Sequence, residues 1–230
     1  MSSVRAMQLL RLSGFASARP GAFQPAMLRP LAKRAMDVTI AGTALLVLAV
    51  PMLLLALLVK LDGGPAMFAH TRVGRGGKRF GCLKFRSMVT DAEARLNALL
   101  AADPAARAEW EANRKLRHDP RVTRIGAFLR ATSLDELPQL LNVLRGDMSL
   151  VGPRPVTASE LAANYGAAAE HYQAVRPGIT GPWQVSGRSD TSYDRRVALD
   201  VAYATQPSLA EDIRLLLRTP AAVLLRRGAY

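Results

Sequence analysis

The amino-acid sequence predicts a mainly helical α+β protein, with a re-entrant helix-break-helix hairpin in a membrane and a compact cytoplasmic domain. Three observations support this class: an uncharged apolar run that contains a proline, two short strand-like segments, and helical composition over much of the remaining chain. We expect a flexible leader over residues 1–30 and a re-entrant membrane helix over residues 31–62. A cytosolic domain then follows over residues 63–230, with a small β-hairpin and amphipathic helices at the membrane interface, one of them at the C-terminus.

The overall composition limits the location and the partners of the chain. The 230 residues contain a single cysteine, Cys82, so an intrachain disulfide is excluded and nothing indicates an oxidising compartment. The formal net charge of +13 calls for an anionic partner: nucleic acid, anionic lipid headgroups or a phosphorylated substrate. In the leader, Arg11 interrupts the apolar stretch that a secretory signal needs, so we expect a poorly ordered or membrane-surface segment.

The apolar run extends from Val38 to Val59 without a charged residue, which is long enough to cross a bilayer. Pro51 lies within it, and a proline there removes the backbone hydrogen bond to Val47 and predicts a kink or break. Basic residues flank both ends, so charge does not define which end is cytoplasmic. A re-entrant helix, which enters and leaves by the same face, is favoured over a straight span, and a buried core helix is the third alternative.

The segment after the membrane run is strongly basic and rich in turns. Two strand-like pieces separated by Gly74–Gly77 predict a small hairpin. The glycines before Lys78 do not match the spacing of a phosphate-binding P-loop, which argues against a nucleoside triphosphatase. Residues 63–90 contain no acidic residue and six basic ones: Arg72, Arg75, Lys78, Arg79, Lys84 and Arg86.

Much of the remaining chain is predicted to be helical. Residues 91–116 have helical composition with a break at Asp103–Pro104, so we expect two helices or one kinked helix. A C-terminal helix begins near Ser208, and its leucine clusters are interleaved with arginines. This pattern is typical of a helix that lies in the lipid headgroup region, and an ordinary domain-closing helix fits it equally well.

The most informative polar motif is the pair of adjacent carboxylates Asp135 and Glu136. Ser133-x-x-Glu136 matches a capping box, but Pro138 would then fall inside the helix, where its missing N–H is needed. A helix that starts near Asp135 and runs to about Leu144 places the proline in its first turn instead. The free N–H groups of that turn would favour both an ionised Asp135 and a bound phosphate.

The carboxylate pair suggests phosphoryl chemistry. Carboxylates attack phosphorus in enzymes that form aspartyl phosphates, and Asp135 is the candidate nucleophile. Glu136 is a candidate for assisting proton transfer or positioning a metal ion. Arg130, Arg154 and Mg²⁺ are candidates for neutralising the charge at the phosphorus. Helix capping remains the alternative role for the pair on local grounds.

Several motifs in a fixed order, together with the proline-containing run, carry a family resemblance. They are Lys33–Asp37, Lys84–Met88, Asp119–Gly126, Leu134–Gln139, Gly146–Pro155 and Arg176–Gly181. With them the chain resembles the small monotopic phosphoglycosyl transferases, bacterial sugar transferases that initiate exopolysaccharide and O-antigen assembly. The resemblance covers about residues 33–230, and the segment from Gly181 onward looks closest to the undecaprenyl-phosphate galactose phosphotransferase branch.

The resemblance implies a two-step reaction. Asp135 would attack the β-phosphate of a UDP-sugar, UMP would leave, and a hexose-1-phosphate, galactose-1-phosphate in this branch, would pass to undecaprenyl phosphate. Glu136 would assist Asp135, both carboxylates would bind Mg²⁺, Arg130 would bind phosphate and Pro51 would break the re-entrant helix. The family often has serine before this proline, where this chain has Val50, so one hydroxyl partner for the freed carbonyls is missing. Glucose-1-phosphate transfer and a non-catalytic scaffold of polysaccharide assembly are the alternatives.

The remaining site residues have two interpretations each. Lys84 and Arg86 are either phosphate ligands or membrane-facing charges. Arg188 is expected to reach the nucleotide, and Trp183 either stacks on it or packs in the core. The expected location is the bacterial inner membrane, on the cytoplasmic face and in contact with anionic lipids. A homodimer is compatible with the sequence, whereas nucleic acid is not an expected partner because no recognition motif accompanies the charge.

Overall fold

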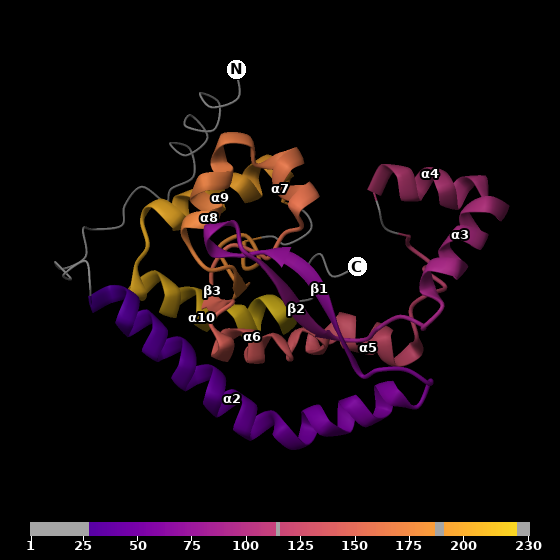
Figure 1. Ribbon diagram of the computed structural model, residues 1–230, viewed down its shortest axis with the longest axis horizontal. Coiled ribbons are helices and arrows are strands. Elements are labelled where there is room, and N and C mark those ends of the chain that lie inside the picture. Colours follow the sequence, from indigo (N-terminus) through magenta and orange to yellow (C-terminus); the bar gives the residue numbers. More distant parts are fainter. Residues whose placement is uncertain (1–27, 114–115, 187–190, 225–230) are drawn as a thin grey trace.

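A computed structural model describes residues 28–113, 116–186 and 191–224. It confirms the mainly helical α+β class: one long helix, α2, lies along the side of a domain that contains two small sheets and shorter helices (Figure 1). Of the predicted leader over residues 1–30, only residues 28–30 are described, and they form the first residues of α2.

The elements follow each other closely along the described chain. The strands are β1 (Met67–Val73), β2 (Arg79–Phe85), β3 (Ser149–Val151) and β4 (Gly178–Thr180). The α-helices are α2 (Leu28–Lys60), α3 (Ala92–Ala102), α4 (Pro104–Asn113), α5 (Arg124–Thr132), α6 (Gln139–Arg145), α7 (Ala158–Asn164), α8 (Ala169–Ala174), α9 (Tyr193–Thr205) and α10 (Leu209–Leu224). Short 3-10 turns are η2 (Arg75–Gly77), η3 (Leu134–Glu136) and η4 (Gly166–Ala168).

Helix α2 is continuous through Pro51 and curves with its concave side toward the domain (Figure 1). A proline removes one of the backbone hydrogen bonds that hold an α-helix together, but the turns on either side keep their own hydrogen bonds. The helix can therefore bend at the proline without ending there. A break that ends the helix at Pro51 is therefore wrong for this structure, whereas the predicted departure from a straight helix agrees with the observed curvature.

Polar contacts fix the first half of α2 to the domain. Asp37 is almost fully buried, and its Oδ1 accepts hydrogen bonds from the Ser149 hydroxyl at 3.1 Å and the Leu150 amide at 3.0 Å. Arg34 donates to the last carbonyls of α6, at Val143 (2.6 Å) and Leu144 (2.8 Å). The charged Lys33–Asp37 motif is thus explained by docking of α2 on β3 and α6.

The other side of α2 is apolar and exposed. Ala41 and Val59 are buried against the domain, but the side chains on the opposite face project outward. Among the described residues, α2 is the one helix long and apolar enough to cross a membrane, and only 6 % of its most apolar window is buried. The alternative of a buried core helix is therefore wrong. The exposed apolar face comprises Leu46, Val47, Val50, Leu53, Leu54, Leu57 and Leu58.

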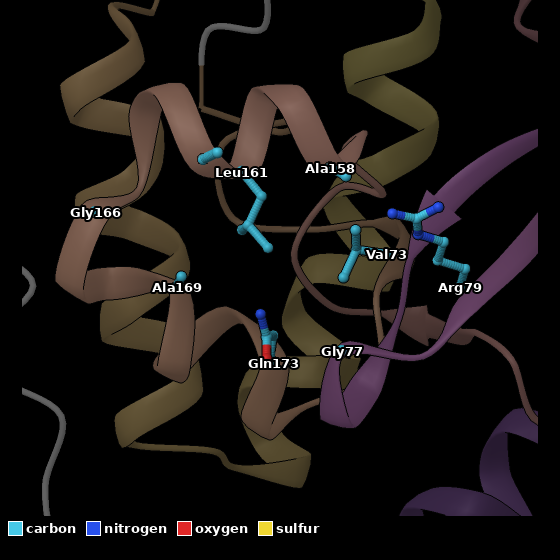
Figure 2. Close-up of a pocket in the computed structure, with 9 residues that line it drawn as sticks. Val73, Gly77, Arg79, Ala158, Leu161, Gly166, Ala169 and Gln173 are labelled. Carbon is cyan, nitrogen blue, oxygen red and sulfur yellow. The ribbon is translucent and has the colours of Figure 1, made fainter.

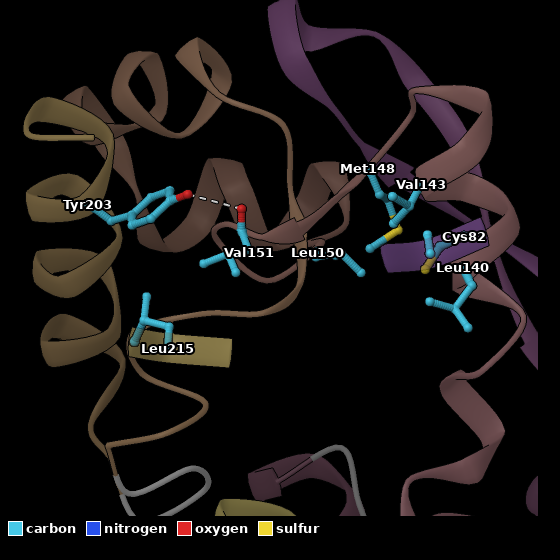
Figure 3. Packing of buried hydrophobic residues seen from close by; sticks show 9 residues of the cluster. Cys82, Leu140, Val143, Met148, Leu150, Val151, Tyr203 and Leu215 are labelled. Atoms are coloured by element: carbon cyan, nitrogen blue, oxygen red, sulfur yellow. Dashed lines mark hydrogen bonds between the residues drawn. The ribbon is translucent and has the colours of Figure 1, made fainter. Parts of the chain in front are cut away.

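The main core lies between α2, α6 and the β3–β4 sheet. Met148, Val143 and Leu150 meet Cys82 of β2 there, and Tyr203 of α9 donates a hydrogen bond to the Val151 carbonyl at 3.0 Å (Figure 3). Leu215 of α10 packs into the same cluster, so α10 closes the domain. Ile213 and Leu217 of α10 remain exposed, and the predicted interfacial role of this helix stays a prediction.

Two local predictions from the sequence are confirmed. Strands β1 and β2 form an antiparallel hairpin in which Met67 pairs with Phe85 and Val73 with Arg79, and Gly76 and Gly77 adopt positive φ in its turn. The chain also breaks between α3 and α4, where the Asp103 carboxylate accepts hydrogen bonds from the first free amides of α4.

A parallel pair, β3 and β4, joins two of the sequence motifs. Ser149 pairs with Gly178 and Val151 with Thr180. A Cβ at Gly152 would lie 2.3 Å from the Arg176 carbonyl oxygen, so this close approach requires glycine. The Gly146–Pro155 and Arg176–Gly181 segments therefore lie side by side, although the sequence separates them.

Candidate active site

The carboxylate pair lies in the tight turn between α5 and α6. Ser133 adopts a left-handed conformation (φ 58°), and its amide donates to the carbonyls of Leu129 and Arg130, which ends α5. Its hydroxyl makes no capping hydrogen bond to η3, the turn that carries Asp135 and Glu136. The capping-box alternative is therefore wrong, because Ser133 closes the preceding helix.

The predicted helix start also needs correction. Helix α6 begins at Gln139, not near Asp135, whereas its end at Arg145 agrees with the predicted end at about Leu144. The reversal at Ser133 and the 3-10 turn together direct the chain back toward β2, so Asp135 precedes the α-helix. The positive charge around Asp135 comes from side chains of other elements, and a helix N-terminus does not explain it.

Lys84, from the end of β2, faces both carboxylates. Its Nζ lies 2.7 Å from Glu136 Oε1 and 3.6 Å from Asp135 Oδ2. Arg154 Nη1 lies 3.6 Å from the same Glu136 oxygen. Asp135 is 9 % exposed, so the site is a nearly enclosed carboxylate beside two cations. Such an arrangement suits the binding of phosphate oxygens next to a carboxylate.

Arg130 approaches the site from α5 and is oriented by Ser87. Its Nε donates to the buried Ser87 hydroxyl at 2.9 Å. Helix α5 comes so close to this segment that a Cβ at Gly126 would lie 1.9 Å from the Ser87 carbonyl oxygen. The Asp119–Gly126 motif thus ends in the glycine that lets α5 bring Arg130 toward Asp135.

Burial and neighbouring charges have opposing effects on the pKa of Asp135. Burial raises the pKa of this carboxyl above its ordinary value, and the neighbouring Glu136 carboxylate raises it further. The nearby Lys84, Arg130 and Arg154 lower its pKa and so favour the ionised form. Desolvation is the largest of these effects, so the pKa of Asp135 lies above its ordinary value although cations surround the carboxyl. A desolvated carboxylate beside cations is an arrangement that suits a nucleophile.

Arg86 has a structural role that the sequence does not predict. It is buried, with 8 % of its surface exposed, and it donates to the carbonyls of Val59 and Pro65 at 2.8 Å and pairs with Asp62. These partners lie at the end of α2 and in the turn after it. Arg86 therefore fastens α2 to the end of β2, its burial argues against a membrane-facing charge, and its role as a phosphate ligand stays a prediction.

Of the two predicted nucleotide-binding residues, Trp183 and Arg188, the structure describes only Trp183. Trp183 is buried, with 8 % of its surface exposed, and the Arg196 guanidinium lies 4.5 Å from the centre of its ring. This face of the ring is occupied, which agrees with core packing, and stacking on a nucleotide stays a prediction. Arg188 lies outside the described residues.

The sequence-based set omits three residues that shape the site. Ser87 orients Arg130, and Arg196 lies on Trp183. Fully buried Asn142 of α6 bonds to the Leu83 amide and the Gly81 carbonyl, which fixes β2 and hence Lys84 beside η3. Ser87 lies inside the Lys84–Met88 motif, so the sequence could have indicated a role for it. Asn142 and Arg196 are single polar residues in helices, whose distant partners no local pattern reveals.

The described residues contain no group of three or more His, Cys, Asp or Glu side chains that could hold an ion. Mg²⁺, however, commonly binds through one or two carboxylates and completes its shell with substrate phosphates and water. Asp135 and Glu136 fit that donor set when a diphosphate is bound beside them.

Comparison with known proteins identifies the family. The model of a family described as bacterial sugar transferase matches residues 28–226. The chain belongs to the bacterial sugar transferase family. This sugar transferase domain therefore includes α2, the carboxylate site and α10, and the predicted membership of the family is confirmed.

Two relatives of this bacterial sugar transferase are similar to it over most of its length. It is 52 % identical over 198 residues to an undecaprenyl-phosphate galactose phosphotransferase of Salmonella typhimurium, covering 86 % of this chain and 41 % of the relative. It is 50 % identical over 201 residues to the exopolysaccharide production protein ExoY of Rhizobium meliloti, covering 87 % and 88 % of the two chains.

A third relative is named for a different sugar. A UDP-glucose:undecaprenyl-phosphate glucose-1-phosphate transferase of Caulobacter vibrioides is 44 % identical over 222 residues, covering 92 % of this chain and 77 % of the relative. The sugar transferase spans less than half the length of some relatives, among them the Salmonella protein, and nearly all of the Rhizobium protein.

Proposed function

We propose that this protein transfers a hexose-1-phosphate from a UDP-sugar to undecaprenyl phosphate and releases UMP, as the initiating step of exopolysaccharide or O-antigen synthesis. In the first half-reaction, an Asp135 oxygen forms a bond to the β-phosphorus while the bond from that phosphorus to UMP breaks. In the second, a phosphate oxygen of the lipid attacks the same phosphorus and the Asp135 carboxylate leaves. The observation that supports this most directly is the nearly enclosed Asp135 beside Lys84.

The surrounding groups have distinct roles in this proposal. Lys84 favours the ionised form of Asp135 and, with Arg130 and Arg154, binds phosphate oxygens as charge develops on them. Glu136, which contacts Lys84 and Arg154, assists Asp135. Asp135 and Glu136 would hold Mg²⁺, which would supply further charge neutralisation at the diphosphate.

Galactose-1-phosphate is the proposed transferred group. Relatives named for galactose transfer are 52 % and 50 % identical to this chain over 198 residues, and a third is 45 % identical over 200 residues. Those named for glucose transfer are 44 % and 42 % identical over 222 and 213 residues. Higher identity to the galactose group favours that sugar, and glucose is the alternative that the donor experiment below tests directly.

The test is a donor panel in the absence of lipid acceptor. With Mg²⁺ in detergent, we expect UDP-galactose to give one UMP per protein as a burst and to leave a hexose-phosphate adduct visible by intact-protein mass spectrometry. UDP-glucose and UDP-N-acetyl sugars serve as comparisons, and chelation of Mg²⁺ should suppress the burst. Release of UMP from none of the donors, with or without polyprenyl phosphate, would refute the catalytic proposal.

We also propose that α2 is re-entrant in the bacterial inner membrane, with the domain on the cytoplasmic face against anionic lipids. Both ends of α2 are fastened to the same domain, through Asp37 at one end and Arg86 at the other. The exposed apolar face lies between these attachments. A straight span would need one of these attachments to be broken, because a bilayer would separate the two ends.

Cysteine labelling tests this topology. Leu31 and Leu61 flank the apolar run and are 68 % and 82 % exposed, so each is replaced by cysteine in a Cys82→Ala background. We expect an impermeant thiol reagent to label neither position from the periplasm and both after the membrane is permeabilised. Labelling of either position from the periplasm would contradict the re-entrant topology.

A further inference from the structure

A second group of basic side chains borders the carboxylate site and lines a pocket. The cavity has a volume of about 90 Å³ and lies between β1, the segment after β3, α7 and α9. Of the described residues that line it, three are arginines and one is a glutamate. The polar and aromatic lining residues that matter here are Arg72, Arg154, Glu160, Trp183, Tyr193 and Arg196. This chemistry favours an anion that also carries hydrogen-bonding groups.

Aromatic rings hold two of the three guanidinium groups in place. Arg196 lies 4.5 Å from the centre of the Trp183 ring and 5.7 Å from that of Tyr193. Arg154 lies 5.9 Å from the centre of the same Trp183 ring. Stacking on a buried indole limits the freedom of both arginines, so a bound anion meets groups that are already ordered.

Arg154 connects the pocket to the nucleophile. It lines the cavity, and its Nη1 lies 3.6 Å from Glu136 Oε1, next to Asp135. The two phosphorus atoms of a diphosphate share one bridging oxygen, so a single planar guanidinium can contact both phosphate groups. When the β-phosphate lies at Asp135, the adjacent phosphate can therefore reach the pocket beyond Arg154.

We infer that this pocket holds the phosphate and the adjoining part of the nucleoside in the nucleoside monophosphate half of the donor, with Arg196 as a ligand of that phosphate and Trp183 as the residue that positions Arg196. The inference rests on the proposed function and adds the site of the leaving group to it. In this arrangement Arg196 contacts the phosphate that departs with UMP, whereas Lys84 and Arg130 contact the phosphate that Asp135 attacks.

The position of the pocket favours the soluble nucleotide over the lipid acceptor. Helix α7, which supplies Glu160, lies across the β1–β2 hairpin from α2 (Figure 1). A polyprenyl chain needs an apolar environment, and the exposed apolar side chains of α2 lie on the opposite side of the domain. The cavity is also too small and too polar for a lipid tail, but it accommodates a phosphate with part of a nucleoside.

The test measures binding of UMP to the full chain with Asp135 replaced by asparagine, so that no reaction interferes. We expect Arg196→Gln to weaken UMP binding by about 10- to 100-fold, the loss of one charge-assisted hydrogen bond to phosphate. In the otherwise unchanged enzyme, the same variant should raise the KM for the UDP-sugar and leave the KM for polyprenyl phosphate unchanged. Arg196→Lys should recover part of the UMP affinity, since it restores the charge.

The control is Arg79→Gln, the same substitution at an exposed arginine. Arg79 lines a separate, shallow pocket between the hairpin and α7, together with Leu161 and Gln173 (Figure 2). We expect this variant to bind UMP like its parent. Thermal unfolding of all variants separates loss of UMP affinity from loss of folding. If Arg196→Gln does not fold, the UMP affinity of Arg196→Lys decides.

The outcomes separate this inference from the proposed function. If the parent binds UMP and both Arg196 variants bind it equally tightly, the inference is wrong while the catalytic proposal stands. A rise in the KM for polyprenyl phosphate alone would assign the pocket to the acceptor and would also overturn the inference. If the parent binds no UMP and releases none from any donor, the proposed function itself fails.

Discussion

Replacing Asp135 with asparagine abolishes the UMP burst and lowers turnover by at least about 10⁴-fold, the scale of loss when a covalent nucleophile is removed. An amide has nearly the same shape, but it does not form the acyl phosphate bond. The neutral side chain also leaves Lys84, 3.6 Å away, with one carboxylate fewer. Rapid-quench measurement of UMP, with and without polyprenyl phosphate, checks this expectation.

The matched control is Asp91→Asn, the same substitution at an exposed carboxylate whose ion pair with Arg95 lies on the surface of α3. This variant should keep the full burst. Glu136→Gln keeps the nucleophile and should slow both half-reactions while the adduct still forms. An adduct on Asp135→Asn would move the covalent chemistry to another residue, and Glu136 would then be the first candidate.

The pH profile belongs to the same prediction. Burial raises the pKa of Asp135, and only the ionised carboxylate is nucleophilic, so kcat/KM should fall as pH drops through that raised pKa. Lys84 lowers the pKa of Asp135 by favouring the charged form. Lys84→Met should therefore move the acid limb to higher pH, whereas Asp91→Asn should leave it in place.

The features that local sequence predicts well are those that local forces determine. Glycines with positive φ fix the turn of the β1–β2 hairpin, and Asp103 followed by proline separates α3 from α4. The apolar run also predicts α2 and its exposed face, because 22 residues without a charge suit lipid better than a protein core. Each of these signals lies within a few residues of the structure that it specifies.

The features that were missed depend on partners far along the chain. Lys84 meets Glu136 across 52 residues of sequence, and Asn142 holds β2 from a helix 59 residues later. The predicted start of α6 was wrong because Ser133, in a left-handed conformation, ends α5 instead of beginning the next helix. The sequence shows a capping pattern, but it does not show which helix the serine caps. Asp135 became the candidate nucleophile from its motif alone, and this assignment does not depend on where α6 begins.

Substitution of Arg86 should have a large effect on stability. The guanidinium satisfies the carbonyls of Val59, Pro65 and Met88 and pairs with Asp62 in a buried position. Lysine has one ammonium group and does not reproduce this planar set of donors. We expect Arg86→Lys to lower the free energy of unfolding by about 3 kcal/mol, because carbonyls and a carboxylate lose their partners.

Thermal unfolding in detergent and the KM for the UDP-sugar together decide between the two roles of Arg86. A structural role predicts loss of stability with an unchanged KM in the molecules that remain folded. Arg79→Lys, the same change at an exposed position of β2, should alter neither quantity. Full stability with a raised KM would instead place Arg86 at the substrate. It would also mean that the link from β2 to the end of α2 contributes little, and the structural support for a re-entrant α2 would then rest on Arg34 and Asp37 at the other end.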